Sequence, residues 1–100
     1  MQYIQLVEFD ASHPADEVRQ ALAAWLEAIR GNRTLQMAVV AADHDRGNHY
    51  WELLEFPSEE EAARSTGLPE TKEAYERWLR LVDGEPMFHN LDVIEQVGGT

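Results

Sequence analysis

The chain of 100 residues contains no cysteine, few basic residues and no long apolar run. Without cysteine, disulfide bridges, thiolate metal sites and cysteine nucleophiles are excluded. Eight Lys and Arg residues stand against 19 Asp and Glu residues, which gives a net charge of −11. Such a charge repels phosphate backbones and anionic membranes, so we expect neither nucleic acid nor a membrane as a partner.

Membrane-spanning segments and export signals are not expected either. No stretch approaches the roughly 18 apolar residues that cross a bilayer. Met1 to Ile4 leads straight into a strand pattern, without the basic and apolar regions of a signal peptide. These features favour a soluble, cytoplasmic protein with one hydrophobic core.

Alternating and β-branched apolar residues predict four strands. The predicted segments are 3–9, 34–42, 49–56 and 87–96, and the turn-forming residues 43–48 join the second strand to the third as a hairpin.

Apolar residues at helical spacing predict two helical regions between these strands. The first follows Pro14, which suits a first turn, and runs to about Ile29. The second begins after Ser58, which stands at capping-box spacing from Glu61. Residues 67–69, Gly-Leu-Pro, interrupt this second helix before it resumes.

The resulting order is β-α-β-β-α-β, the arrangement of an α+β, ferredoxin-like domain with a four-stranded antiparallel sheet. One domain over residues 1–97 and a flexible tail over 98–100 are predicted. Two helical regions cover only one face of such a sheet, yet both faces are apolar. We expect a second copy to cover the other face, giving a homodimer. The alternative is a monomer with a partly exposed sheet.

The strand "HYWELLEF" places one glutamate on each face. Glu52 shares its face with apolar neighbours, so burial should raise its pKa toward the range of a general acid or base. The alternative is a structural acid paired with an arginine or with a polar group of a neighbouring strand, such as Gln5 or Asn90. Glu55 points to the opposite face, where we expect it to pair with Arg33 or with an arginine of the partner.

Further polar and aromatic residues are candidates for the same cleft. The hydroxyls of Tyr50 and Tyr75 are expected to orient a substrate, and Trp78 to stack on an aromatic ligand. Asn90 and Asp92 share one face of the last strand and would add a polar spot near Glu52. The alternatives are plain core aromatics and polar groups that satisfy the end of a strand.

The histidines do not predict a metal centre. His44 and His49 lie with two aspartates in or beside the predicted hairpin turn, where local turn bonding accounts for them. We therefore expect no metal ion.

The whole pattern resembles a known family. The strand-to-helix passage "ELLEFPSEEEA" and the closing "FHNLDVIE" are similar to the dimeric α+β barrel superfamily, and within it to the antibiotic biosynthesis monooxygenase-like domains. The resemblance implies a cleft between helices and sheet that acts, without a cofactor, on a hydrophobic aromatic or polyketide-like molecule by monooxygenation or proton transfer. At the places of the asparagine and tryptophan of the quinone-forming oxygenases, this chain has Glu52 and Phe56.

Two other functions stay open. One is a ligand-binding or structural dimer without turnover, and the other is haem degradation, although all four histidines lie outside residues 58–82, where haem-degrading relatives carry their axial ligand. The predicted catalytic residue is Glu52, and the predicted substrate-binding residues are Tyr50, Phe56, Tyr75, Trp78, Asn90 and Asp92.

Overall fold

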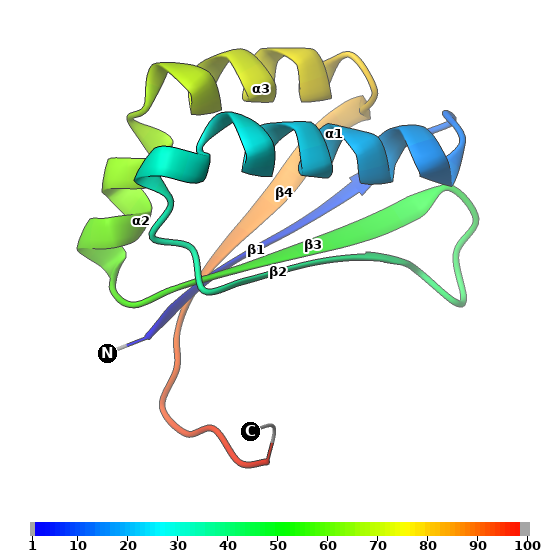
Figure 1. Ribbon diagram of the computed structural model, residues 1–100. Helices are drawn as coiled ribbons and strands as arrows, with labels where there is room; N and C mark the ends of the chain where they lie inside the picture. The colour runs from blue at the N-terminus through cyan, green and yellow to red at the C-terminus, as the bar shows by residue number, and fades with distance from the viewer. Residues whose placement is uncertain (1, 99–100) are drawn as a thin grey trace.

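The structure, a computed structural model, describes residues 2–98 as one sheet with one helical layer (Figure 1). The elements are β1 (Tyr3–Asp10), α1 (Ala15–Ala28), a short 3-10 turn (Arg30–Asn32), β2 (Met37–Ala42), β3 (His49–Phe56), α2 (Glu59–Thr66), α3 (Pro69–Leu79) and β4 (Asp83–Asp92). The predicted ferredoxin-like α+β fold is confirmed, with the second helical region split in two.

The sheet is antiparallel throughout and has the order β2-β3-β1-β4. The long helices α1 and α3 lie beside each other over one face, with the shorter α2 at one end (Figure 1). Because β1 and β3 are central, their alternate side chains point either into the helical layer or onto the open face. This alternation decides which residues enter the site.

The break in the second helical region follows local chemistry. The Ser58 hydroxyl caps α2 by accepting the backbone N–H of Glu61 at 3.2 Å. Gly67 ends α2, and Pro69 occupies the first turn of α3, where its missing N–H costs nothing. The predicted cap and the predicted break are both confirmed.

Two predicted strand boundaries were wrong, and the sheet register explains both. β2 begins at Met37 rather than residue 34, because Met37 already lies opposite Glu55 and β3 ends one residue later. β4 covers 83–92 rather than 87–96, because Asp92 lies opposite Tyr3 at the start of β1. Beyond the backbone bond from Val93 to Gln2, residues 94–96 have no strand to pair with. The predicted tail includes residues 99 and 100, which lie outside the described residues.

Aromatic packing fixes one end of the core beneath the helices. Phe9 stacks on Tyr50 with ring centroids 5.8 Å apart and meets Trp78 edge-on at 4.9 Å. Val7 and Val18 complete the same buried cluster. Rings buried in this way contribute both apolar area and a preferred mutual geometry.

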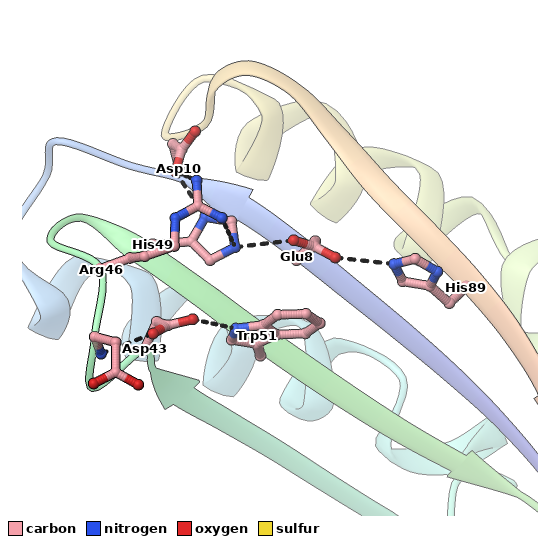
Figure 2. A network of polar contacts seen from close by, with 8 residues as sticks. Glu8, Asp10, Asp43, Arg46, His49, Trp51 and His89 are labelled. Atoms are coloured by element: carbon pink, nitrogen blue, oxygen red, sulfur yellow. Dashed lines mark hydrogen bonds and ion pairs between the residues drawn. The ribbon is translucent and has the colours of Figure 1, made fainter.

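The open face of the sheet combines exposed apolar residues with a polar network, and Figure 2 shows the network. Exposed apolar side chains from this face belong to Met37, Val39, Met87 and Leu91. A tryptophan, Trp51, is half-buried there and donates its indole N–H to Asp43 at 3.0 Å. The apolar character predicted for both sheet faces is thus present in the folded chain.

His49 and Glu8 form the centre of the polar network (Figure 2). His49 is only 5% exposed, with Nδ1 2.7 Å from Asp10 and Nε2 3.1 Å from Glu8. The second Glu8 oxygen lies 3.0 Å from Nε2 of His89. The hydrogen bond from His89 is the main cause that lowers the pKa of Glu8; partial burial opposes it and His49 reinforces it. His49 therefore bonds across the sheet to β1, in addition to the predicted local contact, in which Arg46 of the turn lies 3.4 Å from its Nε2.

Glu55 also lies on the open face, as its position in the strand predicts, but within residues 2–98 it pairs with Gln2 and not with Arg33; pairing with an arginine of a second copy stays a prediction. The Gln2 amide donates to Glu55 at 2.8 Å. A side-chain amide near the chain start therefore satisfies this buried carboxylate.

The network on the open face should contribute measurably to stability. We expect His49→Phe, which keeps a ring but removes both nitrogens, to lower the free energy of unfolding by about 2 kcal/mol, since two carboxylates lose a partner. Urea denaturation checks this, with His44→Phe at an exposed hairpin position as the control. An unchanged free energy of unfolding would show that water replaces His49 at no cost.

Candidate active site between helices and sheet

A cavity of about 630 Å³ lies between the sheet and helices α1, α2 and α3. Its walls are mostly apolar, and a few polar side chains reach it from the strands and from the second helical region. This size and this lining are typical of small-molecule sites. The cavity is therefore the candidate active site.

Glu52 is the central polar group of the cavity. Its place opposite Val7 in the register puts its side chain on the helix side of β3. The residue is 7% exposed, and its Oε2 has no hydrogen-bond partner among residues 2–98. A buried carboxyl without a full set of partners is unusual, because such groups are normally satisfied.

Burial raises the pKa of Glu52 to about 7, with the nearby indole of Trp78 opposing the rise. The indole Nε1 of Trp78 is itself buried and makes no hydrogen bond within the described chain, so its effect on the carboxyl is only a weak one. A carboxyl with this pKa exchanges a proton readily at neutral pH.

The predicted alternative for Glu52, a structural bond to Gln5 or Asn90, has no support in the described contacts. Both residues line the cavity, and both lie on the helix side of their strands. Neither forms a hydrogen bond to Glu52 within the described residues. The side chains around Glu52 thus leave one enclosed carboxyl oxygen without a partner, on a residue that lines the cavity.

The cavity brings together five of the seven predicted site residues. Glu52, Phe56, Tyr75, Trp78 and Asn90 line it. Tyr50 does not, because it is 8% exposed in the core against Phe9. Asp92 does not either, because it pairs with Tyr3 at the end of the sheet and is exposed there.

Several lining residues were not among the predicted site residues. Trp25 of α1 donates its indole N–H to the Thr71 hydroxyl of α3 at 2.9 Å, which ties the two helices together at the cavity wall. Ser65 of α2 contributes a buried hydroxyl without a described partner. Phe88 stands two positions before Asn90 in β4, so strand alternation was a signal that pointed to it. Trp25 and Ser65 had no comparable signal, because helix packing decides which of their faces meets the cavity.

No protein-family model matches the chain, and no curated protein matches it. Solved structures do. A variant of SnoaB, a cofactor-independent oxygenase from Streptomyces nogalater, superposes with a TM-score of 0.83 and 9% identity over 98% of both chains. The chain has the antibiotic biosynthesis monooxygenase fold. Candidate antibiotic biosynthesis monooxygenases from Caulobacter crescentus and Chloroflexus aurantiacus have the same fold.

The two further neighbours extend the fold likeness at somewhat higher identity. The Caulobacter protein has a TM-score of 0.80 and 14% identity over 94% of this chain and 91% of its own. The Chloroflexus protein has a TM-score of 0.75 and 19% identity over 98% of both chains. Likeness at this identity establishes the antibiotic biosynthesis monooxygenase fold, and the activity has to be argued from this chain's own residues.

Two observations bear on other classes of site. Within residues 2–98, no three His, Asp or Glu side chains are grouped as a metal ion requires. In the same range, no helix has the length and apolar character needed to cross a bilayer.

From the raised pKa of Glu52 we predict how the free energy of unfolding changes with pH. Between pH 4.5, the ordinary value, and about 7, the folded chain keeps a proton that the unfolded chain has released. The free energy of unfolding therefore falls as pH rises through this window, by up to about 3 kcal/mol from this group. We expect Glu52→Gln to remove that decline.

Urea denaturation at pH 5 and pH 8 checks the prediction. Glu55→Gln, which changes a buried carboxyl on the opposite face of the same strand, is the control and should keep the decline due to Glu52. Equal pH dependence in Glu52→Gln and wild type would mean that Glu52 is well solvated in the folded protein.

Proposed function

We propose that the cavity binds a hydrophobic aromatic molecule and that Glu52 exchanges a proton with it, without a cofactor. The observation that carries the proposal is the buried carboxyl, with its pKa near 7 and its free Oε2, in a cavity walled by aromatic rings. A base of this pKa is ionised in a large fraction of molecules at neutral pH, yet strong enough to take a proton from an activated C–H or O–H group.

Two reactions follow from this proton transfer. In the simpler one, Glu52 removes a proton next to a carbonyl and returns it elsewhere on the molecule, which is an isomerisation. In monooxygenation, loss of the proton makes an electron-rich ring that reacts with O₂. A ring CH₂ then becomes C=O, the second oxygen atom leaves as water, and the substrate supplies all four electrons. The fold shared with a cofactor-independent oxygenase supports this second reaction.

The other cavity groups would position the substrate. Phe56 and Trp78 present apolar ring surface, while Tyr75 and Asn90 offer hydrogen bonds nearer the solvent. Desolvation by the apolar walls strengthens every polar contact that the substrate makes with Glu52. Binding energy from the rings would thus hold the reacting carbon against the carboxyl.

Oxygen uptake with anthrone, a probe whose ring CH₂ is activated by a carbonyl, tests the catalytic assignment. We expect Glu52→Gln to lower kcat/KM by about 100-fold or more, because it removes the proton acceptor. Wild-type activity should rise with pH through about 7 as the carboxylate forms. Glu55→Gln should retain activity, and undiminished turnover in Glu52→Gln would refute the role of Glu52.

A ligand-binding dimer without turnover is the second candidate, and one observation favours it. Ser65 and Trp78 leave buried polar atoms unpaired beside Glu52, an arrangement that also suits simple recognition of a polar ligand group. Tight binding of anthrone with no oxygen uptake would support this candidate.

No observation favours haem degradation, because the described α2 and α3 carry no histidine. The cytoplasmic location stays a prediction.

We also propose that a second copy covers the open face of the sheet. Val39 and Leu91 are more than two-fifths exposed on this face, and Ile94 and Val97, just after β4, are nearly fully exposed. Exposed apolar residues in this number favour an interface. A homodimer buries the surface and leaves the cavity on the outer side of each sheet.

A charge on the open face should separate the two copies. We expect Val39→Lys to raise the dimer dissociation constant by about 100-fold or more, because the ammonium would be desolvated in the interface. Leu79→Lys, at a similarly exposed apolar position on α3, is the control. Sedimentation equilibrium gives the masses, and a Val39→Lys dimer of unchanged affinity would place the interface elsewhere.

A further inference from the structure

Glu52 combines a buried position with an acceptor oxygen that the chain does not use. Glu52 is more than nine-tenths buried, and its Oε2 forms no hydrogen bond within residues 2–98, although the Trp78 indole lies near enough to lower the pKa of the carboxyl. Glu52 forms no ion pair with any residue of the range 2–98. Because Glu52 lines the cavity, a ligand donor that reaches its carboxyl group would recover part of the cost of burying it.

The walls around this carboxyl are rings. Tyr75 and Trp78 have centroids 5.7 Å apart, and Phe88 lies 6.3 Å from Tyr75 and 6.4 Å from Trp78. Tyr75 and Phe88 are each 42% exposed, although both are aromatic and line the cavity. Clustered aromatic faces attract a cation that approaches to within about 6 Å of a ring centroid.

We propose that the ligand is an aromatic amine, whose ammonium group pairs with Glu52 while its rings pack against Trp78, Tyr75 and Phe88. The inference rests on the proposed function for the cavity and its aromatic ligand only. The amine is a bound ligand and not the molecule that gives up a proton, because its ammonium group occupies the carboxylate of Glu52. A carboxylate together with clustered rings provides the two interactions that an ammonium group uses, ion pairing and cation–π attraction.

The charges on the cavity favour a cation over an anion. Its ionisable lining residues with a formal charge are Glu52, Lys72 and Glu76, of which Lys72 and Glu76 are exposed. An anionic ligand group at Glu52 would bring two negative charges together in a desolvated site, which is costly. The net charge of −11 also attracts cations at long range and repels anions.

The cation should change the protonation of Glu52. In the free protein the pKa of Glu52 is about 7 because of burial, and a neighbouring ammonium favours the ionised form and lowers that pKa. Binding of the amine near pH 7 therefore releases a proton, and affinity increases as pH rises through this value. A neutral ligand of the same shape gains no such increase.

Isothermal titration calorimetry with three indole probes of different charge tests the inference. Tryptamine is cationic, tryptophol is neutral and indole-3-acetate is anionic, and all three share one ring. At pH 8 we expect tryptamine to bind about 10-fold or more tighter than the other two, and to bind weaker at pH 5.5. Proton release is measured by repeating the titration in buffers of different ionisation enthalpy.

Glu52→Gln and Glu55→Gln provide the variant comparison. We expect Glu52→Gln to weaken tryptamine about 10-fold or more and tryptophol by less than about twofold, with Glu55→Gln unchanged for both. The comparison of tryptamine affinity at two pH values uses the wild-type protein, so it tests the amine assignment even if Glu52→Gln does not fold.

The outcomes separate this inference from the proposed function. Equal affinity for the three probes, an affinity for tryptamine that does not rise with pH, or no binding of any probe would overturn the amine assignment. If anthrone still drives oxygen uptake in any of these cases, the proposed function stands. Conversely, Glu52-dependent tryptamine binding without oxygen uptake would keep the amine site and refute the catalysis.

Discussion

The rest of this structure depends on one constraint: both faces of the sheet are apolar, but the helices cover only one of them. The helical layer buries Val7, Phe9 and Phe56 and encloses the cavity, while the other face keeps exposed residues such as Val39 and Leu91. Strand alternation assigns every side chain of β1 and β3 to one of these two settings. The site and the proposed interface therefore lie on opposite sides of the same strands and do not compete for residues.

The two buried glutamates of β3 show how strongly the setting decides chemistry. Glu55 accepts a hydrogen bond from Gln2 on the open face, whereas Glu52, three residues earlier, has an unpaired oxygen in an apolar cavity. Burial in that cavity raises the pKa of Glu52 to about 7. The same side chain on the same strand is thus a structural anchor on one face and a candidate proton carrier on the other.

Much of the fold followed from sequence pattern, and the errors have a common cause. The Ser58 cap, the break before Pro69 and the parity of Glu52 depend on local chemistry and were predicted correctly. The ends of β2 and β4 were not, because a strand ends where its partner ends, and register is a property of two strands. For His49 the local contact with Arg46 was predicted and the two partners on β1 were not, since they lie 39 and 41 positions away.

The sequence by itself determined the order of elements, the apolar character of both sheet faces and which residues share a face with Glu52, because periods of 2 and 3.6 residues are written into single segments. Only the tertiary structure decided which groups meet Glu52. Trp78, Ser65 and Phe88 reach the cavity from three different elements, while Tyr50 is drawn into the core by Phe9. Packing between distant segments sets these distances, and no period along the chain encodes them.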